Sequence, residues 1–233
     1  MALTKAAHRF QDLVEAATAV FIAQGYRRTQ IEDVARAMGV AKGTVYLYVQ
    51  SKAALFDLAL RCADMPRPLA VPGALPRRTP PAGAALRYVA ARIAEADPAA
   101  PVLAAARRRV PEVEDEFAGL VRGLYAVMTR HRTSIKLVDR CAADYPDLAR
   151  LWFARGREAL VTAVARYLET RIRQQQIRRV PDVMVAARLI VETVVFWAVH
   201  RHWDPAPQPF DPTVAEDTIV QLLVDGLVAR RRP

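Results

Sequence analysis

The sequence has 233 residues, of which 53% are hydrophobic and 25% are charged, and its formal net charge is +10. This composition provides enough apolar side chains for the core of one or two globular domains and excludes a disordered chain. No run of about eighteen apolar residues occurs, and the first residues lack the apolar stretch of a signal peptide. We therefore expect a cytoplasmic protein with no membrane partner.

Residue patterns typical of catalysis are missing from the sequence. There is no Walker loop, Gly-x-Gly-x-x-Gly, Gly-x-Ser-x-Gly or His-Glu-x-x-His motif. His200 and His202 are two residues apart, so on a helix they would point to different sides and make poor joint metal ligands. We therefore predict that the protein is not an enzyme and has no catalytic residues, metal site or cofactor.

The cysteines and one pair of aspartates are interpreted structurally. Cys62 and Cys141 are too few for a disulfide framework, and we expect them to be small buried or half-buried side chains. Asp144 and Asp147 flank Pro146 and are interpreted as helix caps, not as an acid–base pair.

The first predicted helix covers residues 4–24. Its apolar residues recur on one side at helical spacing: Phe10, Leu13, Val14, Ala17, Val20 and Phe21. Gly25 can end the helix because a residue without a Cβ adopts positive φ cheaply, and Tyr26 is expected to pack beneath it. We expect this helix to cover the two short helices that follow.

The stretch Thr29–Lys52 is predicted to form two short helices joined by a tight turn. Thr29 and Glu32 have the spacing of a capping box, so the first of these helices should begin near Gln30. One side of it is apolar: Ile31, Val34, Ala35 and Met38. Gly39 provides the stop.

The second short helix is predicted to begin by about Lys42. Val45 and Val49 are four residues apart and can pack inward, and Gly43 allows a close backbone approach. The remaining surface presents Lys42, Thr44, Tyr46, Leu47 and Tyr48. These side chains suit a DNA groove because they can reach base edges and phosphates.

The next helix is predicted to cover residues 53–63 and to begin beside a phosphate contact. Ser51 is a natural cap for this helix, and Lys52 stands beside its amino-terminal end. The helix either transmits motion from the rest of the chain or is a plain connection.

Together these motifs resemble the amino-terminal domain of TetR-family transcriptional regulators. The resemblance covers about the first sixty residues and rests on Gly25-Tyr26, Thr29, Asp33-Val34-Ala35, Gly39-Val40, Lys42-Gly43-Thr44-Val45-Tyr46, Tyr48 and Ser51-Lys52-Ala53-Ala54-Leu55. It implies an all-α, dimeric, DNA-binding repressor with a variable carboxy-terminal domain that binds an effector. Gln30 stands where the family often has a Ser or Thr that contacts phosphate, and Ala41 stands where it often has Ser. The predicted DNA contacts are Thr29, Gln30, Lys42, Gly43, Thr44, Tyr46, Leu47, Tyr48 and Lys52.

The net charge alone does not locate the DNA-binding surface. Residues 1–64 contain eight basic and six acidic residues, so most of the excess positive charge lies later in the chain. Net charge reports nonspecific attraction and not which element reads bases. The later arginine clusters are interpreted as solvated helix faces.

The rest of the chain divides at its prolines. Residues 65–81 contain six prolines and are predicted to form a loop between a DNA-binding domain at 1–64 and a helical effector-binding and dimerisation domain at 82–233. Helices are expected at about 82–96, 98–109, 112–143, 146–175, 181–203 and 212–230, because prolines suit a first helical turn.

The last two predicted helices have apolar faces wider than one neighbour needs. Two such helices from each of two subunits would bury these faces as a four-helix bundle, and a two-fold dimer suits a near-palindromic operator. The predicted dimer residues are Ile190, Val194, Trp197, Ile219, Leu222, Leu223 and Leu227. The alternative is that both faces are buried within one chain.

A small-molecule site is expected among the middle helices because the resemblance places it there. The candidates are Tyr125, Met128, Trp152 and Phe153, although aromatic residues and a methionine at helical spacing are more often ordinary core residues. The leading hypothesis is a dimeric repressor that an effector releases from double-stranded DNA. The alternatives are a DNA-binding regulator controlled by a protein partner and a helical enzyme or scaffold.

Overall fold

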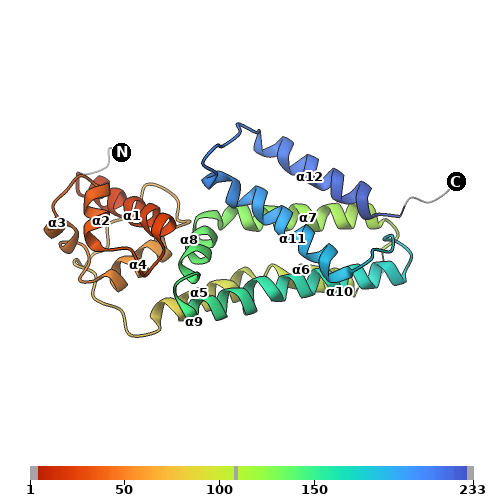
Figure 1. Cartoon of the computed structure of the whole chain (residues 1–233), viewed down its shortest axis with the longest axis horizontal. Helices are drawn as coiled ribbons and strands as arrows, with labels where there is room; N and C mark the ends of the chain where they lie inside the picture. Colours follow the sequence, from red (N-terminus) through yellow and green to blue (C-terminus); the bar gives the residue numbers. More distant parts are fainter. Residues whose placement is uncertain (1–4, 108–109, 230–233) are drawn as a thin grey trace. The chain divides into compact units, whose positions relative to one another are not determined.

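The computed structural model describes residues 5–107 and 110–229, and within these ranges it contains helices and turns but no β-strand (Figure 1). The predicted all-α fold class is confirmed. None of the helices in these ranges combines the length and the hydropathy that a bilayer crossing requires. The predicted helix ends at 109 and 230 lie outside the described residues.

The contacts between residues divide the chain into two compact units. The first comprises the described residues up to Arg92 together with Thr133–Trp152. The second comprises Ile93–Arg132 and the described residues from Phe153 onward. The first unit therefore extends beyond residue 64 and includes a segment from much later in the chain.

The first unit is built on a helix-turn-helix. Its helices are α1 (Lys5–Gln24), α2 (Ile31–Ala37), α3 (Lys42–Tyr46), α4 (Lys52–Cys62), most of α5 (Ala84–Ala96), most of α8 (Arg132–Ala142) and α9 (Pro146–Ala149). The apolar side predicted for α1 is buried as expected, and α1 packs against α2 and α4. Tyr26 stacks on Phe21 and lies against Phe56, with ring centroids 6.2 and 4.9 Å away. Both cysteines are buried.

The start of α2 differs from the prediction by one residue. The residue that precedes the helix is Gln30, and its N–H donates to the carboxylate of Asp33 at 2.9 Å. The predicted Thr29–Glu32 capping box is wrong, because the Thr29 hydroxyl instead donates to the Gly25 carbonyl at 2.7 Å. The cap of α4 is confirmed, since Ser51 Oγ accepts the Ala54 N–H at 3.2 Å.

The helix predicted over 112–143 breaks at His131. It forms α7 (Val113–Arg130) and α8, whose first free N–H groups, on Thr133 and Ser134, donate to one carboxylate oxygen of Asp64 at 3.0 and 3.2 Å. The cap comes from about seventy residues earlier in the chain. Local sequence therefore carried no signal for this break.

The second unit is a packed set of longer helices. These are α6 (Ala99–Ala106), α7, α10 (Ala159–Arg173), α11 (Val183–Ala198) and α12 (Pro212–Leu227), with a 3₁₀ turn at His200–Trp203. Helix α10 packs on α6 and α11, and α7 packs on α11 and α12. The helix predicted over 146–175 is instead α9, a π-helix at Arg150–Glu158, and then α10.

A buried ion pair holds the middle of the second unit. Arg171 is fully buried, and its Nη2 lies 2.7 Å from Glu116 on α7 and 3.0 Å from the Ala105 carbonyl on α6. The hydroxyl of Tyr167 donates to the same glutamate at 3.0 Å. Burial and the Glu116 charge raise the pKa of Tyr167, which therefore stays a neutral donor. This network joins α10 to α6 and α7.

Two glycines with positive φ provide a matched test of the first unit. Gly25 has φ +83° and Gly39 has φ +66°, but a Cβ at Gly25 would lie 2.6 Å from Asp144 Oδ2, whereas a Cβ at Gly39 would meet nothing within 4 Å. We expect Gly39→Ala to lower the free energy of unfolding by about 1–2 kcal/mol through backbone strain alone.

Gly25→Ala should cost about 2 kcal/mol more, because it displaces Asp144 and the two hydrogen bonds that this carboxylate accepts. Urea denaturation followed by far-UV circular dichroism measures both variants. Equal midpoints for the two variants would contradict the role given to Asp144.

Candidate nucleic-acid interface

Helix α3 presents a mixed polar and aromatic surface while two valines hold its underside. Val45 and Val49 have no exposed surface, whereas Tyr46 is 42% and Leu47 is 67% exposed. Lys42 and Gly43 are also exposed, and Thr44 and Tyr48 are half-buried. This is the arrangement expected from the spacing of the valines. Tyr46 is the last residue of this five-residue helix and Leu47 follows it, so the two exposed side chains are adjacent at the helix end.

A tight turn fixes α3 relative to α2. Gly39 has φ +66°, which favours glycine, and the Val40 N–H donates back to the Ala35 carbonyl at 3.0 Å. On the other side of the turn, the Thr44 N–H donates to the Ala41 carbonyl at 2.9 Å. The backbone itself therefore sets the direction of α3.

The structure gives two of the predicted contact residues internal roles. Thr29 is completely buried, and its hydroxyl donates a hydrogen bond to the Gly25 carbonyl. The ammonium group of Lys52 donates to the carbonyls of Tyr26 and Arg27 at 3.0 and 3.1 Å and lies 4.9 Å from the centre of the Tyr26 ring. Lys52 therefore ties α4 to the turn before α2. Gln30, by contrast, is exposed.

The carboxylate of Asp144 binds the same turn through its N–H groups. Asp144 accepts the N–H groups of Tyr26 and Arg27 at 3.1 and 3.0 Å. It was expected to cap a local helix, but it caps a turn nearly 120 residues earlier. Asp147 instead forms a salt bridge with Arg150. The importance of Asp144 and Asp64 follows only from tertiary packing.

Comparison with known proteins gives this helix-turn-helix a family. Residues 13–59 match the family described as bacterial regulatory proteins, tetR family. The family assignment therefore belongs to the amino-terminal segment that contains the helix-turn-helix. No curated protein matches the sequence.

Solved structures share the fold along nearly the whole chain. The ketosteroid transcriptional regulator KstR2 of Mycobacterium tuberculosis is 17% identical with a TM-score of 0.55, over 98% of each chain. A TetR-family regulator from Mesorhizobium loti is 19% identical with a TM-score of 0.51, over 97% of this chain and 100% of that one. A tetR-family regulatory protein from Rhodococcus RHA1 is 18% identical with a TM-score of 0.51, over 96% and 97%.

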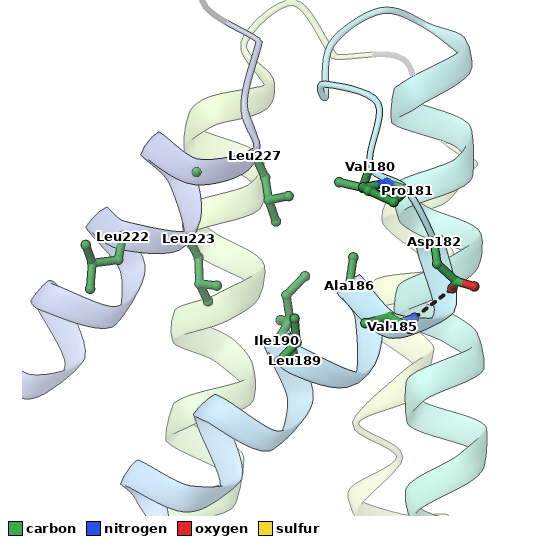
Figure 2. Close-up of a pocket in the computed structure, with 11 residues that line it drawn as sticks. Val180, Pro181, Asp182, Val185, Ala186, Leu189, Ile190, Leu222, Leu223 and Leu227 are labelled. Atoms are coloured by element: carbon green, nitrogen blue, oxygen red, sulfur yellow. Dashed lines mark hydrogen bonds between the residues drawn. The ribbon is translucent and has the colours of Figure 1, made fainter.

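In the second unit, α11 and α12 leave an apolar groove open between them. The groove is lined mainly by apolar side chains: Val180, Pro181, Val185, Ala186, Leu189, Ile190, Leu222, Leu223 and Leu227. Figure 2 shows Leu223 and Leu227 of α12 facing Ala186 and Ile190 of α11. Leu189 and Leu222 are 61% and 68% exposed.

The predicted dimer residues divide into two sets. One set is almost fully buried within the subunit: Ile190, Val194 and Ile219. These positions follow the alternative prediction, in which the apolar faces are buried within one chain. Trp197, Leu223 and Leu227 are half-buried, and Leu222 is exposed. Four further apolar residues of α11 are exposed and were not predicted, namely Met184, Val185, Leu189 and Phe196, because periodicity alone does not show which side of α11 faces its own subunit.

The four candidate effector residues occupy different environments. Tyr125 and Met128 are buried on α7 in the second unit, and Phe153 is 38% exposed. Trp152 belongs to the first unit, where its indole N–H donates to Asp139 at 3.2 Å. None of the four lines the groove between α11 and α12.

Lys52 and Lys42 are expected to affect different properties, stability for Lys52 and DNA binding for Lys42. Lys52→Met keeps the aliphatic stem but loses two hydrogen bonds, so we expect it to lower the free energy of unfolding by about 1–2 kcal/mol. It should leave the slope of log Kobs against log salt for DNA binding unchanged. Lys42→Met should leave stability unchanged and weaken operator binding by about 1–3 kcal/mol.

Denaturation midpoints and salt titrations of both variants provide the measurement. A slope that becomes shallower by about 0.9 per subunit in Lys52→Met would show that this ammonium contacts a phosphate.

Proposed function

We propose that this chain binds a near-palindromic DNA operator as a homodimer and represses transcription until a small molecule releases it. The observation that carries the proposal is the exposure of Tyr46 and Leu47 beside Lys42 on a helix anchored by two buried valines. A short helix whose outer surface can donate hydrogen bonds and make apolar contacts suits the major groove. The family match to residues 13–59 supports this placement.

The proposed DNA contacts differ in kind along the helix-turn-helix. Lys42, Thr44 and Tyr46 are proposed to reach base edges, and Gly43 would allow the helix to approach the DNA backbone closely. Gln30 and Tyr48 are proposed to bind phosphates at the two edges of the groove. Leu47 provides apolar contact, for which a thymine methyl group is a suitable partner.

The proposed dimer interface is the exposed apolar face of α11 and α12. Solvent exposure of Leu189, Leu222 and Val185 leaves apolar area that a second copy would remove from water. A two-fold axis at this interface would allow the two copies of α3 to enter successive major grooves about 34 Å apart. The dimer would thereby convert two weak half-site contacts into one specific complex.

The proposed release by an effector is supported by the way α8 joins the DNA-binding helices. Asp64 caps the start of α8, and Asp144, just after its end, binds the turn before α2. Helix α8 follows α7 of the second unit directly in the chain. A ligand that prefers another arrangement of the second unit would shift the population away from the DNA-bound state, limited by its differential affinity for the two states.

Selection of binding sites from a random duplex library tests the proposed function. We expect the purified protein to enrich a near-palindromic sequence, and the Thr44→Ala, Tyr46→Ala double variant to lose that enrichment while keeping its helical content. Thr213→Ala, on the exposed start of α12, removes a similar hydroxyl group and should select as the parent does. Retained enrichment in the double variant would favour a helical enzyme or scaffold.

Charge substitution in the groove tests the dimer. Leu189→Asp and Leu222→Asp should fold, because both positions are exposed in the subunit, but should shift the sedimentation mass from dimer to monomer. Met65→Asp places the same charge on a residue of the first unit that is 51% exposed and should leave the mass unchanged. A dimer that persists in both leucine variants would place the interface elsewhere.

A further inference from the structure

The proline-rich loop between α4 and α5 forms backbone hydrogen bonds with the residues that follow α3 (Figure 1). The Arg77 N–H donates to the Tyr48 carbonyl at 2.7 Å, and the Gln50 N–H donates to the Arg77 carbonyl at 3.0 Å. Val49 and Arg77 thus form an isolated parallel bridge. Because bridged chains lie about 4.8 Å apart, the backbone of Arg77 runs directly beside the segment that leaves α3.

Further contacts hold the loop on both sides of this bridge. The Thr79 hydroxyl donates to Ser51 Oγ at 2.8 Å, and the Thr79 N–H donates to the Gln50 side chain at 3.4 Å. Earlier in the loop, Leu69 is buried and its N–H donates to Gln11 on α1 at 3.4 Å. The position of Arg77 is therefore fixed by the backbone of the loop and does not depend on its own side chain.

Three arginines of this loop differ in what their side chains do. Arg67 pairs with Glu15 at 3.3 Å and donates to the carbonyls of Cys62 and Met65. Arg77 and Arg78 are exposed, and their guanidinium groups make no salt bridge or hydrogen bond within the described part of the chain. Residues 65–92 contain five arginines and no acidic residue, so no carboxylate of this segment neutralises the pair.

We propose that Arg77 and Arg78 bind DNA phosphates beside the half-site that α3 reads. The inference rests on the proposed function and extends it with a second element. The chain that leaves a recognition helix meets the sugar–phosphate backbone at the edge of the major groove, and the bridge to Tyr48–Gln50 holds Arg77 at that place. A guanidinium group can bind a phosphate through two parallel hydrogen bonds. The loop thus adds affinity without base specificity.

Salt dependence provides the first measurement, on duplexes recovered by the site selection and on a random duplex of equal length. We expect the Arg77→Ala, Arg78→Ala double variant to make the slope of log Kobs against log salt shallower by about 0.9 per arginine for each bound subunit. The loss should be similar on both duplexes, and the selected sequence should not change. The Arg77→Lys, Arg78→Lys double variant should retain most of the slope, because an ammonium group also binds phosphate.

Arg179→Ala is the matched control. Arg179 is exposed in the second unit, and its removal changes the net charge by the same amount per site. If Arg179→Ala changes the slope by the same amount per arginine as the Arg77→Ala, Arg78→Ala variant, the effect is one of general charge and the proposal is overturned. Far-UV circular dichroism and the denaturation midpoint of each variant should match those of the parent.

Phosphate ethylation interference gives the direct readout. Ethyl groups on particular phosphates flanking the half-site should weaken binding of the parent protein and have no effect on the Arg77→Ala, Arg78→Ala variant. The same interference pattern in both proteins would overturn the proposal while leaving operator binding intact. A parent protein that enriches no sequence at all would instead overturn the proposed function, so the two failures are distinguishable.

Discussion

Both the N–H groups and the carbonyl groups of Tyr26 and Arg27 are hydrogen-bonded to charged side chains. The placement of the helix-turn-helix depends on these hydrogen bonds. The two N–H groups donate to the carboxylate of Asp144, and the two carbonyls accept from the ammonium group of Lys52. Four polar groups of an otherwise irregular turn are thereby satisfied, which keeps their desolvation from costing free energy. Because α2 begins only a few residues later, a shift of this turn would move α2 and, through the tight turn at Gly39, α3. The exposed surface of α3 is therefore oriented by a carboxylate and a lysine that lie outside α2 and α3.

Helix α3 combines weak intrinsic stability with a fixed position. Five residues are too few for a helix to persist alone, since nucleation costs more than one turn of hydrogen bonds returns. Burial of Val45 and Val49 compensates, and the bridge to Arg77 adds hydrogen bonds just after the helix ends. The buried valines and the bridge therefore hold α3 in place while Lys42, Tyr46 and Leu47 stay exposed.

Local patterns predicted much of this fold, and apart from the capping box at Thr29 the errors discussed below have one common physical origin. The apolar spacing in α1, the inward valines of α3 and the glycine stops at Gly25 and Gly39 are local, and the structure has each of them. The break at His131, the cap from Asp144 and the internal use of Lys52 depend on partners distant in sequence. A lysine beside a helix start is equally consistent with binding a phosphate and with binding two backbone carbonyls. Only the packed structure distinguishes these uses.

The distribution of charge also depends on residues that are distant in sequence but belong to the same compact unit. Counted along the chain, residues 1–64 have eight basic and six acidic residues, which suggested that the positive excess lies away from the DNA reader. Counted by compact units over the described residues, the first unit has sixteen basic and nine acidic residues, and the second has thirteen basic and fifteen acidic residues. Most of the net charge of +10 therefore belongs to the unit that contains α3, and the loop arginines account for much of the difference. Nonspecific attraction to a polyanion depends on where charges gather in space. The excess of positive charge and the exposed surface of α3 therefore belong to the same unit.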